Sequence, residues 1–268
     1  MRHTETDEEI MNNKLLMAHQ VAGYPDNETA LTAAEALIAG GTGILEVQLA
    51  FSDPSADGPA IQTACSSVLA KGYTVKDGLN YIAEIKKRHP EIPVFIMTYG
   101  SLVYRPGVEN FVKQAHDAGV SGLIVPDLPF DCDEGLTAAC KKYGMHNIPV
   151  AAPSMTEERL HKMATAGFKY IYTALRAGIT GSRTVITDEM LSFIDKAAEG
   201  GSTILGGFGI STGEQSALLA PHVTGVIAGS VFVNLITNNY DPANLEESRK
   251  KIFEDIKAKA EELTAPLK

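Results

Sequence analysis

The sequence predicts an α/β fold, a single-domain (β/α)8 TIM barrel that spans residues 1–268. Short apolar segments rich in β-branched residues alternate along the whole chain with amphipathic segments of helical period. This alternation is typical of a parallel sheet covered by helices. Eight such strands fit a closed barrel better than a doubly wound sheet, and 268 residues is an ordinary length for one barrel. No linker or low-complexity segment indicates a second domain.

The expected strands share short length and apolar character, and they are Leu15–Val21, Ile44–Leu49, Val94–Thr98, Gly122–Val125, Ile148–Ala151, Tyr170–Ala174, Thr203–Leu205 and Gly225–Ala228. The amphipathic segments between them predict helices at Glu28–Ala39, Val75–Arg88, Val108–Ala118, Gly135–Lys142, Glu157–Ala166 and Glu189–Ala198. Glycines follow several of these helices, which is typical of helix C-caps. We also expect an extra N-terminal helix in residues 1–13, closing the barrel bottom, and a charged C-terminal helix at Asn244–Leu263.

Composition excludes several classes of protein. The net charge of −10 argues against a sequence-blind nucleic-acid binder, so an anionic substrate would need local donors. The polar, acidic N-terminus is no signal peptide, and no apolar run approaches the ~20 residues of a membrane span. Cys65, Cys132 and Cys140 lie too far apart for a zinc motif and predict no disulfide framework. We therefore expect a cytoplasmic protein with neither a metal site nor a membrane segment.

Two carboxylates mark the most informative stretch of the chain, ILEVQLAFSDPSADGP at 44–59. Glu46 interrupts an apolar strand that is expected to be buried on both faces, where an unpartnered carboxylate is costly. Asp57 lies on the loop that follows, at the strand end where parallel α/β folds build active sites. Taken alone, Asp57 before Gly58-Pro59 also fits a turn residue, and Glu46 also fits a structural buried acid.

Two glycine clusters follow the last two strands, Gly206–Ser211 and Ala228–Ser230, and the second opens a short helix at Val231–Ile236. Backbone N–H groups and a helix N-terminus at this place in a barrel predict a phosphate site. A third loop, Arg176–Thr184, follows the sixth strand and is a candidate for closing over a ligand. The competing interpretations are ordinary turn glycines and a plain surface loop.

Taken together, these residues resemble the α subunit of tryptophan synthase, over nearly the whole chain. The most specific part is L-E-x5-F-S-D-P-x-A-D-G-P at 45–59. Further matches follow in the order of the family: GYP at 23–25, MTY at 97–99, VPDLP at 125–129, YIYTALRAGITG at 170–181, GFGIS at 207–211 and AGS at 228–230.

The resemblance implies a carbon–carbon lyase of L-tryptophan biosynthesis. It would cleave indole-3-glycerol phosphate to indole and glyceraldehyde 3-phosphate by retro-aldol general acid/base chemistry. The implied partner is a pyridoxal-phosphate β subunit in an αββα tetramer, with no cofactor in this chain. By position, Glu46 matches the proton-transfer residue, Asp57 the acceptor of the indole N–H, and Tyr172 the tyrosine beside the catalytic acid. The remaining matches are Tyr99 and Phe208 in the pocket, Thr180 in the closing loop, Gly181, Gly209, Gly229 and Ser230 at the phosphate, and Asp53 facing the partner.

This chain also departs from the family pattern. Gln48-Leu49-Ala50 stands where the family usually has Gly, an apolar residue and Pro. Gln48 is expected on the same side of the strand as Glu46, where it would hydrogen-bond Glu46 or narrow the pocket. Further departures are His19 for an aromatic carbocycle of the indole pocket, Ser101 for Asn and Asn234 for Lys.

Three alternatives to the leading interpretation stay open. One is a stand-alone lyase that releases free indole, and Gln48 and Ala50 are the residues that favour it. Another is an inactive α-like chain that only activates a β subunit, which the intact Glu46 and Asp57 argue against. The last is a different barrel that binds a phosphate ester, which would not need the motif at 45–59.

Overall fold

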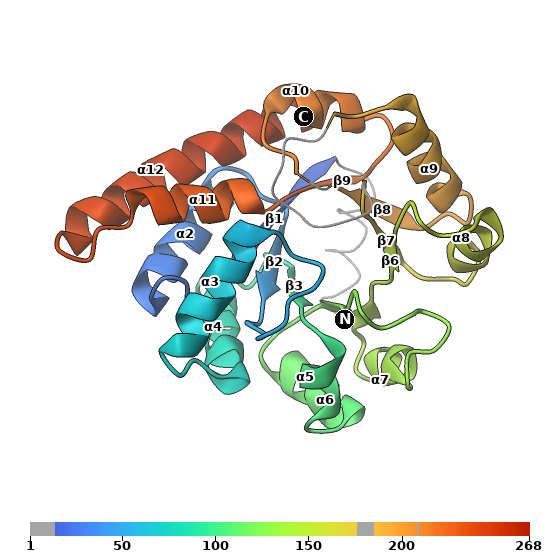
Figure 1. The fold of residues 1–268 in the computed structure, drawn as a ribbon, viewed down its shortest axis with the longest axis horizontal. Coiled ribbons are helices and arrows are strands. Elements are labelled where there is room, and N and C mark those ends of the chain that lie inside the picture. Colours follow the sequence, from blue (N-terminus) through green and yellow to red (C-terminus); the bar gives the residue numbers. More distant parts are fainter. Residues whose placement is uncertain (1–13, 176–184, 208) are drawn as a thin grey trace.

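The computed structural model describes residues 14–175, 185–207 and 209–268. Within them, nine parallel strands form one sheet in the order β5-β4-β3-β2-β1-β9-β8-β7-β6. Helices surround this sheet on its outside (Figure 1). The strands are β1 (Leu15–Val21), β2 (Ile44–Gln48), β3 (Val94–Met97), β4 (Gly122–Ile124), β5 (His146–Asn147), β6 (Val150–Ala151), β7 (Tyr170–Thr173), β8 (Thr203–Gly206) and β9 (Gly225–Ala228).

The predicted (β/α)8 barrel is confirmed, with one difference in its fifth strand. We expected a single strand at Ile148–Ala151, and the structure has two short strands, β5 and β6, on either side of Ile148-Pro149. β5 pairs with β4, and β6 pairs with β7. Pro149 has no N–H to donate to a ladder, although its carbonyl accepts from Tyr172 N at 3.0 Å. The chain thus passes from one edge of the sheet to the other and closes the barrel.

The helices that the pattern predicted are present within a few residues of the expected bounds. Together with those not predicted, they are α2 (Asn27–Ala39), α3 (Pro59–Ala70), α4 (Val75–Arg88), α5 (Gly100–Tyr104), α6 (Val108–Asp117), α7 (Leu136–Lys142), α8 (Glu157–Ala164), α9 (Asp188–Ala198), α10 (Gly213–Leu219), α11 (Ser230–Asn239), α12 (Leu245–Thr264) and the 3-10 helix η1 (Ala265–Leu267). The expected helix in residues 1–13 lies outside the described residues.

Local sequence explains where several helices begin. Asp26 and Thr74 accept hydrogen bonds from backbone N–H groups in the first turns of α2 and α4, and Asp77 completes a capping box on α4. α3 begins differently, with Gly58 as its N-cap and Pro59 in the first helical position. Proline is favoured there because that N–H has no helical partner in any case. The Asp57-Gly58-Pro59 loop therefore ends at the start of a helix.

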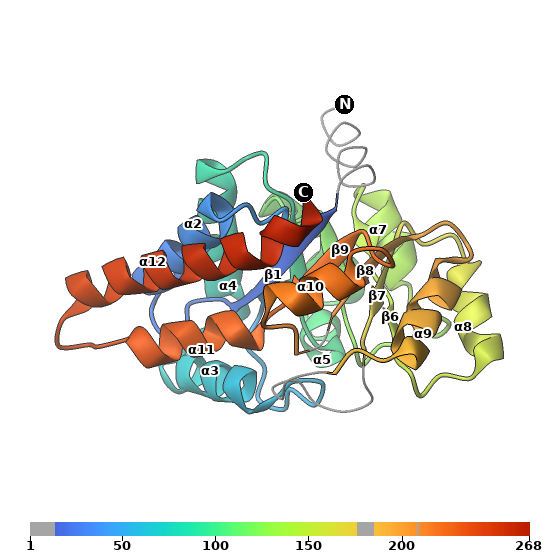
Figure 2. The same cartoon turned by 90° about the horizontal axis from the view of Figure 1, so that it is seen from above.

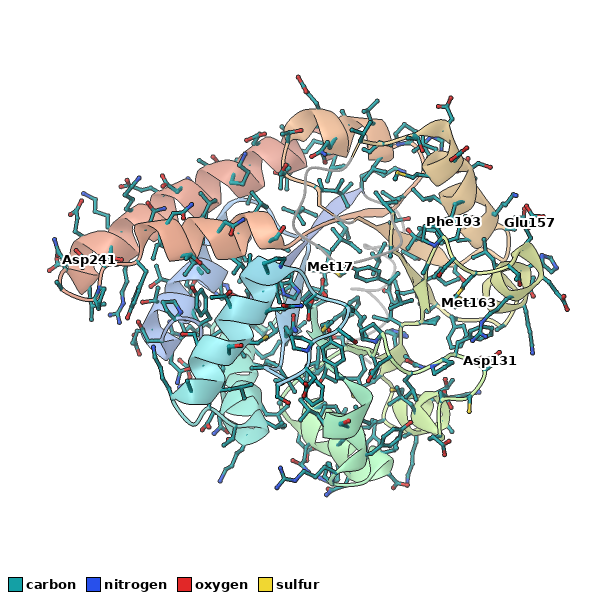
Figure 3. All side chains as sticks on the ribbon, viewed as in Figure 1. Met17, Asp131, Glu157, Met163, Phe193 and Asp241 are labelled. Atoms are coloured by element: carbon teal, nitrogen blue, oxygen red, sulfur yellow. The ribbon has the colours of Figure 1, made fainter. Side chains whose placement is uncertain are left out.

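Alternation along the strands separates an inner and an outer core. On β2, Ile44 packs inside the barrel, whereas Leu45 and Val47 pack between the sheet and the helices. Met17 of β1 belongs to the inner cluster and lies near the middle of the ring of helices (Figure 3). Glu46 shares the inward side of Ile44, since side chains on a strand repeat with a period of two. An apolar interior therefore underlies the polar groups near the carboxyl ends of the strands.

Two helices that follow β9 cover one side of the barrel. α11 lies between α12 and α3, and the long α12 also packs against α2 (Figures 1 and 2). α11 starts directly after β9, so its N-terminus is placed at the carboxyl end of the barrel. Within the described part of the chain, no helix is both long and apolar enough to cross a membrane.

Candidate active site

A pocket with a cavity volume of about 250 Å³ opens at the carboxyl ends of the strands. Its lining residues come from strand ends and from the loops that follow them. They are His19, Glu46, Ala56, Asp57, Ile61, Met97, Ile124, Pro126, Val150, Ala152, Ser154, Tyr172, Ala174, Gly207, Gly209, Ile227, Gly229 and Ser230. The barrel thus brings together six of the residues singled out from the sequence: Glu46, Asp57, Tyr172, Gly209, Gly229 and Ser230.

Asp57 is fixed in place by two side-chain donors. Its side chain is buried, with the residue 3% exposed, and Oδ2 accepts from Gln48 Nε2 and from the Tyr99 hydroxyl, both at 2.7 Å. Gln62 Nε2 donates to the Asp57 carbonyl at 2.8 Å. Burial raises the pKa of the Asp57 carboxyl, although His19 and the two donors act in the opposite direction. The carboxylate is therefore held in one orientation in a poorly solvated place.

Glu46 has a different partner. Nδ1 of His19 lies 3.2 Å from Glu46 Oε1, and the two residues are opposite each other in the register of β1 and β2. Glu46 is 2% exposed, and its Oε2 has no hydrogen-bond partner among the described residues. One carboxylate oxygen is thus engaged by the imidazole, and the other remains for a group that enters the pocket.

The position of Gln48 corrects one expectation. Gln48 does face inward like Glu46, but its Nε2 donates to Asp57 and lies 3.6 Å from Cys65 Sγ rather than reaching Glu46. The reason is that the loop after β2 folds Asp57 back over the strand end, while His19 already occupies the side of Glu46 that faces β1. Burial raises the pKa of Cys65 to about 12, so this neighbour is a neutral thiol.

The tyrosines singled out from the sequence occupy two different places. Tyr172 on β7 lines the pocket, and burial together with the charges of Glu46 and Asp57 holds its pKa well above the usual value. It is therefore a neutral phenol. Tyr99 lies behind Asp57, outside the pocket lining, where it stacks on Phe51 at 5.2 Å between ring centroids. Its hydroxyl also accepts from Ala56 N at 3.1 Å, so Tyr99 supports the loop that carries Asp57.

Glycines and the start of a helix line another part of the pocket. Gly229 is the N-cap of α11 and Ser230 its first residue, so the partial positive charge of a helix N-terminus faces this part. Gly209 has a φ of +73°, a conformation that favours glycine. Among the described residues that line the pocket there is no Lys or Arg. Neutral amides and a helix dipole suit a small phosphate ester.

Other residues singled out from the sequence lie elsewhere. Asp53 is exposed on the loop after β2 and accepts a hydrogen bond from Ser52 Oγ, away from the pocket lining. Thr180, Gly181 and Phe208 fall in the segments that the structure leaves undescribed. Apolar walls such as Ile61, Ile124 and Val150 were missed. Ile124 and Val150 lie at strand ends and Ile61 lies in the first turn of α3, and these positions do not distinguish them from core residues.

The arrangement supports acid/base chemistry on an aromatic phosphate ester. Glu46 has one carboxylate oxygen without a partner among the described residues, and Asp57 is an oriented acceptor. The apolar walls of the pocket suit a flat ring. In the described ranges, no group of three or more His, Cys, Asp or Glu residues is placed to hold a metal ion.

Comparison with known proteins supports the family that the sequence resembles. A family model described as "Tryptophan synthase alpha chain" matches residues 6–264. The tryptophan synthase alpha chain of Methanosarcina barkeri is 38% identical over 254 residues, covering 94% of this chain and 91% of that protein. That of Helicobacter hepaticus is 38% identical over 230 residues, covering 83% and 85%.

Solved structures agree with these relatives. Mycobacterium tuberculosis tryptophan synthase superposes with a TM-score of 0.84 at 30% identity, covering 99% of this chain and 98% of that one. A chain from the tryptophan synthase a2b2 complex of Pyrococcus furiosus superposes with a TM-score of 0.83 at 30% identity, covering 94% and 98%.

Proposed function

Since this chain belongs to the tryptophan synthase alpha chain family, we propose that the pocket at the carboxyl end of its barrel is where indole-3-glycerol phosphate is cleaved. The chain is a carbon–carbon lyase of L-tryptophan biosynthesis that forms indole and glyceraldehyde 3-phosphate. The observation that carries the site assignment is that Glu46 and Asp57 line the same pocket as the backbone cradle at Gly229 and Ser230.

Retro-aldol chemistry explains why two acids are needed. An indolyl carbanion is a poor leaving group, so the bond at C3 breaks after C3 is protonated. Glu46 delivers that proton and takes one from the glycerol hydroxyl, and its unpartnered Oε2 supports this role. Asp57 accepts the indole N–H and stabilises the positive charge that develops at the ring nitrogen. Tyr172, a neutral phenol that lines the same pocket, is assigned to the catalytic set by family position, as the tyrosine beside the catalytic acid.

Binding of the phosphate is assigned to backbone groups. Gly209, Gly229 and Ser230 hold it at the N-terminus of α11, which supplies donors without a formal charge. By family position, Gly181 completes this set and Thr180 belongs to the loop that closes over the substrate. Phe208 is assigned to the indole pocket on the same ground. Tyr99, expected in the pocket but lying behind its lining, acts on the substrate through its hydrogen bond to Asp57.

The partner follows from the family and from the solved a2b2 complex. We place this chain in an αββα tetramer with a tryptophan synthase β subunit that receives the indole. Asp53 on the exposed loop after β2 is assigned to that interface. No cofactor is assigned to this chain, and pyridoxal phosphate belongs to the β subunit. The proposal also makes residues 1–268 one barrel domain that works in the cytoplasm.

A stand-alone lyase remains the second candidate, and one observation favours it. Gln48, at a position where the family usually has Gly, holds Asp57 in place through a contact internal to this chain. A carboxylate that is already oriented has less need of a partner to order it. Indole release measured with and without a β subunit separates the two candidates.

The test of the site is the Glu46→Gln variant. The isosteric amide keeps the shape of the side chain and cannot transfer the proton, so cleavage should fall by about 10²–10⁴-fold while substrate still binds. Single-turnover cleavage of indole-3-glycerol phosphate, measured beside its dissociation constant, gives both quantities. Near-normal turnover in this variant would refute the assignment.

A further inference from the structure

His19 lies between Glu46 and Gly229. Its Nδ1 lies 3.2 Å from Glu46 Oε1, on the side of the carboxylates. On the other side, a Cβ placed on Gly229 would lie 3.1 Å from His19 Cβ, 3.3 Å from Cγ and 3.5 Å from Cδ2. The Cβ–Cγ–Cδ2 side of His19 therefore lies against Gly229 at the start of α11, where the phosphate cradle is proposed, and Nε2 is the ring atom bonded to Cδ2.

The second ring nitrogen of His19 has no hydrogen-bond partner in the described part of the chain. Nε2 is buried in a residue that is 4% exposed, and nothing in residues 14–175, 185–207 and 209–268 bonds to it. Leaving a buried ring nitrogen without a partner is unfavourable, so a polar group that enters the pocket beside Nε2 would be favoured as its partner. His19 lines the pocket, and a bound substrate is the ligand that can reach it.

The positive charge that His19 can carry also bears on which ligand it binds. The described pocket lining offers an anion no Lys or Arg, so His19 is the member of that lining that can carry a positive charge. The charged groups that act on it are Glu46 on β2 and Asp57 on the following loop. Gly229 and Ser230, the N-cap and first residue of α11, line the same pocket and carry no charge. Burial lowers the pKa of His19, but the two carboxylates outweigh burial and raise it overall.

We propose that His19 is a ligand of the substrate's glycerol phosphate, donating from Nε2 to a phosphate oxygen while Glu46 holds Nδ1. The imidazolium would supply the positive charge that the backbone cradle lacks, and it would tie phosphate binding to the position of the proton-transfer carboxylate. This inference rests on the proposed function, because it takes the phosphate to lie at Gly229 and Ser230.

The probe is sulfate, which mimics the phosphate and keeps its charge constant between about pH 6 and about pH 9. In the wild-type chain, the sulfate dissociation constant should rise about tenfold over this range as His19 loses its proton, the effect expected for a charged hydrogen bond. In His19→Phe, which keeps an aromatic ring of similar size, binding should be weak at the lower pH and should change little with pH.

Two further variants make the test specific. His19→Gln keeps a neutral donor and should bind sulfate without the pH dependence, and it replaces His19→Phe if that variant fails to fold by circular dichroism. Glu46→Gln removes the carboxylate that favours the imidazolium, so the loss of sulfate binding should shift to lower pH. The His19 ¹⁵N resonance, identified by its absence in His19→Phe, should move when sulfate is added.

A comparison of His19→Phe with Ser230→Asp distinguishes the proposed role of His19 from the proposed phosphate cradle. Ser230→Asp places a negative charge in the cradle itself and should weaken sulfate binding whether or not His19 takes part. If Ser230→Asp weakens binding and His19→Phe leaves both affinity and pH dependence unchanged, the role of His19 is overturned and the cradle stands. If neither variant affects sulfate binding, the cradle assignment fails with it.

Discussion

Gln48 donates a 2.7 Å hydrogen bond from Nε2 to Oδ2 of Asp57, so the strand that carries one acid also orients the other. Glu46 and Gln48 are alternate inward residues of β2, and their side chains reach different partners. The neighbouring strand adds His19 to Glu46, and β3 leads to Tyr99, the second donor to Asp57. Both acids are thus held by side chains of this chain alone.

Gln48→Met should lower kcat about tenfold with a smaller change in KM, because a hydrogen bond to a charged group contributes about 1.5–3 kcal/mol. Methionine fills a similar volume but cannot donate to Asp57. Gln62→Met is the matched control, because Gln62 donates to the Asp57 carbonyl and not to its carboxylate. Steady-state indole formation measures both variants. Equal losses in the two would show that the carboxylate contact has no special role.

Asp57→Asn should lower turnover by about 10²–10⁴-fold and yet raise stability at neutral pH. Burial raises the pKa of Asp57 in the folded state, so the unfolded chain ionises first as pH rises, and the free energy of unfolding falls through that window. The neutral amide avoids this loss. Urea unfolding should therefore find the variant more stable at neutral pH, with the advantage disappearing below the ordinary pKa of an aspartate.

Ser230→Asp should raise KM for indole-3-glycerol phosphate by about tenfold or more, because two negative charges would meet in a poorly solvated pocket. The fold should tolerate the change, since an acidic residue is favoured in the first turn of α11. Ser230→Asn is the neutral control of the same size. Initial rates across a substrate series, beside thermal unfolding of both variants, check the prediction. A similar KM in the two variants would contradict it.

Asp53→Lys should reduce the activation of this lyase by a β subunit more than it reduces the basal rate. Asp53 is exposed, lies outside the pocket lining and shortly precedes Asp57 on the same loop. A partner that contacts Asp53 can therefore order Asp57. Glu254→Lys, an exposed acid on α12, makes the same change of charge far along the chain. A β-subunit titration of indole formation compares the two. Full activity without partner, unchanged by its addition, would favour the stand-alone lyase.

Periodicity and glycine placement predicted the barrel well, because buried parallel strands and amphipathic helices leave strong local patterns. α3 was missed because its twelve residues follow directly on the acid-bearing loop and read as part of it. The split of the fifth strand depends on which neighbours its two halves meet, and this is a property of closure that no local pattern contains.

For the site, sequence spacing placed Glu46, Asp57 and the cradle at one end of the barrel but did not show how they are paired. Gln48 was expected to hydrogen-bond Glu46 or to narrow the pocket, and its side chain donates to Asp57, because the loop folds back over the strand end. His19 was noted as a departure, and its pairing with Glu46 follows from strand register, which depends on tertiary structure. The missed apolar walls look like ordinary core residues in the sequence.

The two-residue strands on either side of Pro149 give the barrel a seam. The ladder of β1 with β2 aligns five residue pairs, whereas β4 with β5 and β6 with β7 each align two. β8 with β9 also aligns two, but each of these strands has a longer ladder on its other edge. A segment with few interstrand hydrogen bonds opens at a lower free energy than the rest of a sheet. Amide hydrogens at His146–Ala151 should therefore exchange with solvent before those of β1 and β2. The cylinder would begin to unroll at β5 and β6 rather than at β2, the strand that carries Glu46 and leads into the Asp57 loop.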